Sequence, residues 1–180
     1  QANQTNATVR AGTGLVTLSA ATGIAAKTTI ANVTATNSTS GDIVIVDTAD
    51  GLTVSTGGVN QTGTGAVTLT ATGGTLSVNE TVTSAGAGTI TLNATGGTSD
   101  IAVAAGRAVS STGGSVVLNA DDDITIADTG NVSTTGTGTI TLTANATDGN
   151  STGAIQANQT NATVRAGTGL VTLSAATGIA

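Results

Sequence analysis

The sequence predicts an all-β fold, a parallel β-helix (β-solenoid) with three short strands per coil and about six coils per 155-residue repeat. The first observation is that the 180 residues include no Phe, Tyr, Trp, Pro, Cys, Met or His, so Val, Ile, Leu and Ala must fill the core. The second is that Val, Ile and Thr, which favour strands, are abundant, while no apolar stripe has helical spacing. The third is a short motif that recurs about every 25 residues.

The longest repeat is a duplication. Residues 1–25 (QANQTNATVRAGTGLVTLSAATGIA) recur unchanged as residues 156–180. Residues 1–155 therefore form one full tandem repeat, and residues 156–180 begin the next identical one. Identity at all 25 positions indicates a recent tandem array, which we expect to continue in both directions.

A shorter motif, Gly-X-Val/Ile-X-Leu/Ile, marks the first strand of each coil. Its last residues are 27, 24, 23, 26, 24 and 31 residues apart, which gives six coils per large repeat. Because side chains alternate along a strand, we expect Val16 and Leu18 to face inward and Thr17 to face outward. The motif occupies residues 14–18, 41–45, 65–69, 88–92, 114–118, 138–142 and 169–173.

The second and third strands of each coil follow from the same alternation. A turn with Gly or Asp precedes each second strand, at residues 51–54, 75–78, 100–103 and 123–126. Each third strand carries one inward apolar residue: Val33, Val59, Val82, Val109, Val132 or Val164. Coils stacked at about 4.8 Å would advance the axis by about 29 Å per 155-residue repeat.

The alternatives are two other folds and a disordered chain. A Greek-key β-sandwich usually carries large aromatic residues and does not need six copies of one motif. A propeller blade of four strands generally takes about 40 or more residues. A disordered Gly/Ser/Thr-rich linker usually combines low hydrophobicity with high net charge, whereas apolar alternation runs through this chain and its net charge is −6.

The runs at residues 65–78 (GAVTLTATGGTLSV), 88–97 (GTITLNATGG) and 114–126 (GSVVLNADDDITI) resemble the repeat region of filamentous-haemagglutinin-like exoproteins. These proteins are secreted by the two-partner pathway and include the glycosylated high-molecular-weight adhesins. The resemblance covers nearly the whole chain. It implies that the β-helix is right-handed, that the protein is exported and that it takes part in adhesion.

The second strong signal is the Asn-X-Ser/Thr sequon for N-glycosylation. Of 13 Asn residues only Asn119 lies outside a sequon, although 41 Thr and 13 Ser would place only about four Asn in sequons by chance. Accidental sequons in a Thr-rich β-helix are the alternative. We expect Asn32, Asn60 and Asn131 to point outward on the third strand. The predicted glycosylation sites are Asn3, Asn6, Asn32, Asn37, Asn60, Asn79, Asn93, Asn131, Asn145, Asn150, Asn158 and Asn161.

Other chemistry has little support. His, Cys and Tyr are absent, Lys27 is the only Lys and Glu80 the only Glu, so we predict no enzyme, no catalytic residue and no cofactor. Asp121, Asp122 and Asp123 offer oxygen ligands for Ca²⁺, but we interpret them as a solvated turn and predict no metal site. Four Lys and Arg residues are too few for nucleic acid, and no run of 18 apolar residues predicts a membrane span. Ranks of outward Thr suit ice binding, but Val44, Val46, Val117 and Asn119 interrupt them.

These patterns predict a structural subunit or segment of a long extracellular, glycosylated filament, sheath or stalk at the cell surface. The alternative is the shaft of a secreted filamentous-haemagglutinin-like adhesin with a separate tip. Neither terminus shows a capping helix, a charged edge or Pro. We therefore expect the partners to be further copies of the repeat, by continuation or end-to-end stacking, together with covalent glycans.

Overall fold

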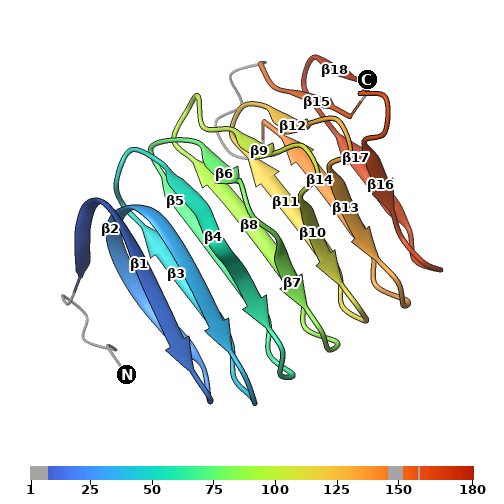
Figure 1. Ribbon diagram of the computed structural model, residues 1–180. Helices are drawn as coiled ribbons and strands as arrows, with labels where there is room; N and C mark the ends of the chain where they lie inside the picture. The colour runs from blue at the N-terminus through green and yellow to red at the C-terminus, as the bar shows by residue number, and fades with distance from the viewer. Residues whose placement is uncertain (1–7, 146–151, 158) are drawn as a thin grey trace.

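Eighteen β-strands and no helix make up the part of the chain that the computed structural model describes, which is residues 8–145, 152–157 and 159–180. All the strand pairings are parallel, and they join the strands into one sheet that winds along the molecule from the N-terminal to the C-terminal end (Figure 1). The prediction of an all-β, parallel, solenoid-like architecture is confirmed.

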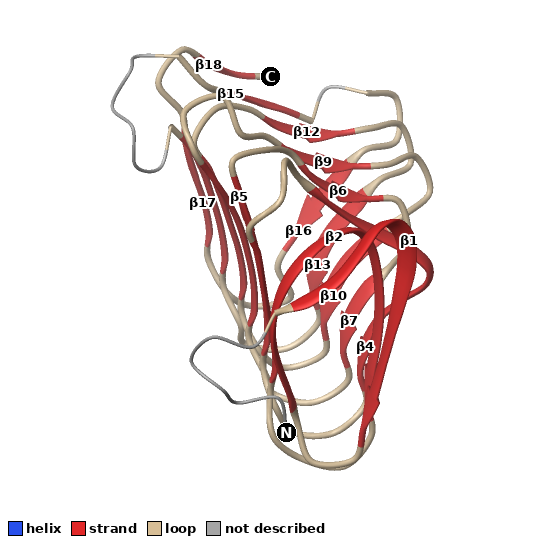
Figure 2. Ribbon diagram, turned by 90° about the vertical axis from the view of Figure 1, so that its left-hand side faces the viewer, coloured by secondary structure: helices blue, strands red, loops and turns tan. Residues whose placement is uncertain are grey.

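From β3 onward the strands lie in three columns, which Figure 2 shows along the stack. Each strand inside a column pairs with its counterparts in the coils before and after it. The first column holds β3 (Ile43–Asp47), β5 (Val67–Thr72), β8 (Ile90–Thr95), β11 (Val116–Ala120), β14 (Ile140–Ala144) and β17 (Val171–Ser174). The second holds the first half of β4 (Leu52–Gln61), then β6 (Leu76–Val78), β9 (Ile101–Val103), β12 (Ile124–Ile126), β15 (Ala154–Gln156) and β18 (Gly178–Ile179). The third holds the second half of β4, then β7 (Val82–Ser84), β10 (Ala108–Ser111), β13 (Asn131–Thr134) and β16 (Thr163–Arg165).

The core consists of aliphatic side chains that stack on one another from coil to coil. Leu92 pairs with Leu69 on one side and with Leu118 on the other, and none of the three has exposed surface. The second column stacks Leu and Ile in the same way, and the third stacks Val. Burial of such a side chain contributes about 1.5–3 kcal/mol. A side chain the size of Trp would not fit between neighbours of this size. This explains why the core is built from aliphatic residues and has no aromatic ones.

The motif glycines form a column of their own where the third strand turns into the next first strand. A Cβ atom on Gly114 would collide with the carbonyl oxygen of Gly88, and one on Gly138 would collide with that of Gly114. The same collision recurs at Gly65, Gly88 and Gly169. At these positions Gly is required for close approach of two backbones rather than for a positive φ.

A column of small polar residues lines the inside of the same corner. It contains Asn37, Gln61, Ser84, Ser111 and Thr134, all buried at the ends of third-column strands. Ser111 satisfies its hydroxyl by donating to Gly88 O at 2.9 Å and accepting from Gly114 N at 2.9 Å. Asn37 and Gln61 likewise donate to Gly41 O at 2.7 and 2.8 Å, whereas the buried hydroxyls of Ser84 and Thr134 have no hydrogen-bond partner.

The N-terminal coils differ from the predicted arrangement. Val16 and Leu18 of β1 (Val9–Ala20), expected in the first column, pair with Val33 and Ala35 of β2 (Ile24–Asn37). Val33, expected in the third column, pairs with Val54 in the second, and Ala35 takes the third-column place beside Val59.

The first column begins instead with Ile24, which pairs with Ile43. These two residues are 19 positions apart, whereas first-column partners in later coils are 23 to 31 apart. The turns made by β1 and β2 are called the short coils below. They are possible because Ile24, Val33 and Ala35 provide one inward aliphatic residue for each column.

The glycine column gives the first testable prediction. Gly114→Ala should lower the free energy of unfolding by about 3 kcal/mol, because the new methyl group has no space beside Gly88 O. The neighbouring Gly113→Ala is the matched control, since its Cβ would meet its nearest atom, Ala87 Cα, at 3.4 Å, an ordinary contact. The control should change stability by less than about 1 kcal/mol. Urea denaturation of both variants measures the difference, and equal losses would contradict the steric explanation.

Candidate functional site

The candidate site is the set of sequon asparagines on the outer surface. Asn79 and Asn161 are exposed, and both lie in turns: Asn79 between β6 and β7, Asn161 between β15 and β16. Asn161 is oriented by its backbone amide, which donates to Asp128 Oδ1 at 3.1 Å. An exposed turn leaves room for a bulky glycan, so these two positions are the most accessible sequons among the described residues.

Asn60, Asn93 and Asn131 are half-buried on the outer face of strands, because a flat sheet partly covers its own side chains. Asn60 and Asn131 lie on third-column strands, as expected. Asn60 accepts a hydrogen bond from Thr83 Oγ1 at 3.1 Å in the next coil, and its Nδ2 donates to Gly57 O at 2.7 Å.

Asn93 belongs to a polar ladder along the outer face of the first column. Its Oδ1 accepts from Asn119 Nδ2 at 3.0 Å, and its Nδ2 donates to Thr70 Oγ1 at 3.4 Å. The ladder gives Asn119, the one asparagine outside a sequon, a structural role. Sequence analysis missed that role, although the equal spacing of Asn93 and Asn119 from the preceding motif leucines contained the signal.

Asn32 is also half-buried, but it lies in the second column, not the third, because of the short coils. Its Oδ1 accepts from Ser55 Oγ at 2.9 Å, and its Nδ2 donates to Thr13 O at 3.0 Å. Asn145 is half-buried at the end of β14 with φ of 68°, a left-handed conformation that Asn tolerates. Asn3, Asn6, Asn150 and Asn158 lie outside the described residues.

Asn37, one of the predicted glycosylation sites, differs from the other described ones because it faces inward. Its side chain is fully buried at the inward polar corner. The amide nitrogen that would carry the sugar donates to Ser40 O at 3.0 Å, Gly41 O at 2.7 Å and Gln61 Oε1 at 3.1 Å, and Oδ1 accepts from Gly23 N at 2.9 Å. A sequon does not reveal whether its Asn faces inward.

The aspartates act as acceptors for backbone amides at the corners. Asp121 Oδ2 accepts from Gly96 N at 2.6 Å, Asp123 Oδ1 from Ala154 N at 2.7 Å, and Asp100 Oδ1 from Asp123 N at 3.0 Å. Among the described residues, no three or more His, Cys, Asp or Glu side chains are arranged to hold a metal ion. The acidic run at 121–123 lies in the turn between β11 and β12. The Asp121 side chain is buried there, not solvated as expected from the sequence, because it accepts the Gly96 amide.

Near this turn, Asp100 is a carboxyl group whose pKa is shifted. Burial raises the pKa of Asp100 above its ordinary value, and the nearby carboxylates of Asp122 and Asp123 raise it further. Hydrogen bonds from the Asp123 amide and the Thr75 hydroxyl oppose this pKa shift.

A surface ion pair links consecutive coils. Arg107 Nη1 lies 3.1 Å from Glu80 Oε2, and such an exposed pair contributes at most about 1 kcal/mol.

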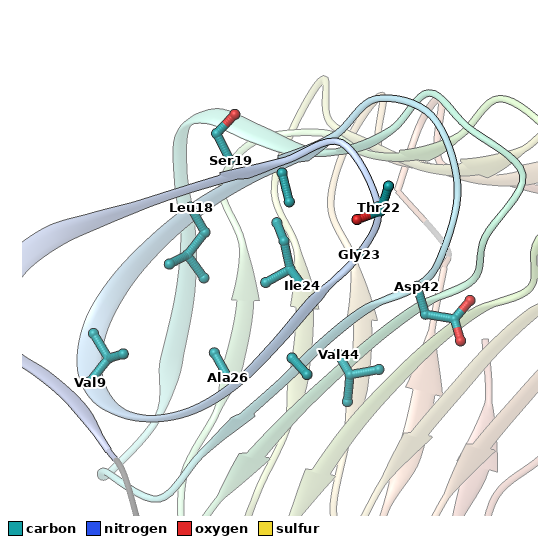
Figure 3. A pocket seen from close by; sticks show the side chains of 11 residues that line it. Val9, Leu18, Ser19, Thr22, Gly23, Ile24, Ala26, Asp42 and Val44 are labelled. Atoms are coloured by element: carbon teal, nitrogen blue, oxygen red, sulfur yellow. The ribbon is translucent and has the colours of Figure 1, made fainter. Parts of the chain in front are cut away.

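A cavity of about 450 Å³ lies at the N-terminal end of the stack, between β1 and β2. Figure 3 shows Val9, Leu18 and Ile24 around it. Its one charged lining residue is Asp42, whose Oδ1 accepts from Ala66 N at 2.8 Å. Ser19 and Thr22 add hydroxyl groups, so the lining is mixed in character.

The two ends of the stack expose the largest apolar surface. At the C-terminal end Leu170 is 68% exposed and Ile179 is 53% exposed, and at the N-terminal end Leu15 is 47% exposed. Strands β16, β17 and β18 pair only with the preceding coil, and β1 pairs only with β2, among the strands described. Within the described residues, the strands of the first and last coils are therefore paired on one side only.

The described part of the chain has no helix of the length and apolar character that a membrane crossing needs. Comparisons with protein-family models, with curated proteins and with solved structures give no match for this chain. The proposal for its function therefore depends on its own residues and geometry.

Asp100 gives a prediction about pH. Because its folded-state pKa is raised, its contribution to stability is full below the ordinary pKa and declines as the pH rises through the raised value. Asp100→Asn keeps the acceptor oxygen and removes the titration. The unfolding free energy of D100N relative to the unsubstituted protein should therefore increase between about pH 3 and about pH 7. Denaturant titrations of both proteins at several pH values measure this, and a constant or decreasing difference would rule it out.

Proposed function

We propose that this chain is a structural segment of a long extracellular, N-glycosylated filament, sheath or stalk. The proposed form is a right-handed β-helix with three strands per coil and about six coils per 155-residue repeat. The supporting observation is the parallel stack, in which like residues pair from coil to coil. Such a stack accepts another coil at its end without any change of geometry.

The proposed mechanism is mechanical. Hydrogen bonds between coils run parallel to the long axis, so stretching the rod would break whole rungs of backbone bonds together. The glycine column and the aliphatic columns allow one close-packed spacing, which makes the rod stiff. Carboxylates such as Asp123, which accepts a bond from the next coil, tie the corners together.

Glycans would cover the outer face of this rod. Only 8% of the residues are charged, so the surface has few groups that repel other copies. Sugars on exposed turns such as those of Asn79 and Asn161 would hydrate the surface and obstruct lateral strand pairing. An adhesin shaft is the second candidate, supported by the likeness of residues 65–78, 88–97 and 114–126 to filamentous-haemagglutinin-like repeats. We propose no catalytic role for either form.

Electron microscopy of the native material tests the filament. We expect thin, uniform fibres with an axial repeat of about 29 Å for each 155 residues. The adhesin alternative instead predicts a separate tip of different shape on each shaft. Compact particles would contradict both forms.

Site-resolved glycopeptide mass spectrometry on the native protein tests the sugars. Asn79 and Asn161 should carry glycans because their side chains are exposed, whereas Asn37 should be unmodified because its amide is buried and fully bonded. Asn37 is the internal control, because it has a sequon but its side chain is buried. If Asn79 and Asn161 carry no sugar, the proposal of N-glycosylation is wrong.

A further inference from the structure

The outer face of the first column carries two parallel ranks of side chains, one on either side of Leu92 and its counterparts. Every member of the first rank is β-branched, and each pairs with the residue at the same position one coil away. The members of this rank are Val44, Thr68, Thr91, Val117, Thr141 and Thr172. The second rank contains the polar ladder of Thr70, Asn93 and Asn119. The two ranks together are called the neutral face below.

The neutral face has no charged side chain among its described residues. Asp47, the one charged residue within the first-column strands from β3 to β17, points inward and is buried. Carboxylates such as Asp100 and Asp128 lie instead in the turns between columns. Two copies with a net charge of −6 each therefore repel one another least when they approach through this face.

The accessible sequons lie away from the neutral face. Asn79 and Asn161 are in turns between the second and third columns, at the corner opposite the first column (Figure 2). Asn60 and Asn131 lie on third-column strands. Asn93 does lie on the face, but both polar groups of its side chain are bonded within the ladder. Sugars on the other four positions would therefore leave this face uncovered.

The side chains of the neutral face keep the cost of covering it low. β-Branched residues are stiff about χ1, so Val and Thr lose little conformational entropy when a partner covers them. The Asn93 amide already bonds to Thr70 and Asn119, so fewer polar groups would lose water without compensation. The methyl groups of the first rank supply apolar surface whose burial is favourable.

A second copy of the chain fits this face because its spacing is the same. Counterparts along each rank repeat once per coil, at about 4.8 Å. Side chains of one copy can therefore lie between those of another over the whole length of the stack, as in the paired sheets of steric zippers. A partner with a different axial spacing would lose this match after a few coils.

The area of the face determines how strong such a contact is. Six coils span about 29 Å and a five-residue strand spans about 16 Å, so each 155-residue repeat offers a footprint of about 450 Å². Stable, specific contacts bury about 800 Å² on each partner. One repeat should therefore associate weakly, whereas two consecutive repeats reach the area of a stable interface.

We propose that the neutral face is a lateral docking surface, on which a second copy of this chain packs side by side through its own neutral face. The inference rests on the proposed function, because it names a lateral partner for the proposed rod. It makes the fibre a bundle, and the cohesion of the bundle increases with the number of repeats in each rod.

Sedimentation equilibrium of the 180-residue chain tests the face. Val117→Lys places a charge near the middle of the neutral face, so two faces in contact would bring like charges together. Thr125→Lys is the matched control, because Thr125 is the outward, half-buried residue of β12, the second strand of the same coil. We expect weak dimers of the unsubstituted chain at about 1 mM. V117K should weaken dimerisation about tenfold or more, and T125K should change it by less than about twofold.

A tandem chain, residues 1–155 followed by residues 1–180, tests the dependence on area. It doubles the footprint, so it should dimerise at a concentration about a hundredfold lower than the single chain. Urea denaturation verifies that this chain and both Lys variants fold. A tandem chain that is still monomeric at about 1 mM would overturn the docking surface.

The sugar at Asn93 gives an independent test, because a glycan there would hold two neutral faces apart. Asn93 should therefore be unmodified in native fibres that are packed side by side. Site-resolved glycopeptide mass spectrometry of such bundles measures its occupancy. Full occupancy of Asn93 in bundled fibres would contradict the inference, whatever the state of Asn79 and Asn161.

The outcomes separate this inference from the proposed function. If V117K associates as strongly as T125K and the unsubstituted chain, the contact is elsewhere, and the filament proposal stands without lateral docking. If the chain binds ice or an insoluble polysaccharide, loses this binding in V117K and does not dimerise, the face has another occupant and the inference is wrong. If V117K abolishes dimers but native material shows compact particles, the docking surface is correct and the filament is not.

Discussion

The structure depends on one interaction, the parallel hydrogen-bonded contact between each strand and its counterpart one coil away. Because that contact repeats along the axis, a residue in one coil must fit against the residue at the same position in the next. Leu92 between Leu69 and Leu118 satisfies this rule in the core, and Gly114 between Gly88 and Gly138 satisfies it at the corner. The same rule explains the composition: a large aromatic residue in one coil would need a compensating gap in both neighbours.

The rule also determines what the sequence can reveal. The glycine motif and the alternating aliphatic residues leave a periodic signal, so the inner coils and the second strands at 51–54, 75–78, 100–103 and 123–126 could be predicted. The N-terminal coils could not. Residues 24–37 offer more than one inward aliphatic residue, and Ala35 takes the third-column place expected for Val33. The choice depends on the strands against which these residues pack, which the local sequence does not specify.

The candidate glycosylation sites, too, could be predicted from the sequence only in part. Sequons are visible in the sequence, but their accessibility is a property of the register. Asn79 lies in an outer turn, whereas Asn37 is held at an inward position beside Gln61 by hydrogen bonds that no triplet motif predicts. The carboxylates are similar: Asp123 and Asp100 resemble ligands or solvated turns in sequence, and their actual partners are backbone amides one coil away. Partners 20 to 30 residues distant become predictable only when the coil length is known.

The parallel arrangement makes the two ends of the stack chemically different. Its last described coil carries Leu173 and Ile179 in their columns, while its first described coils are the short coils, with Asp47 bonded to β2. Contact between such ends is head to tail rather than two-fold symmetric. A head-to-tail contact that stacks coils along one axis leaves a free C-terminal face after every addition, so it builds an open filament and not a closed oligomer.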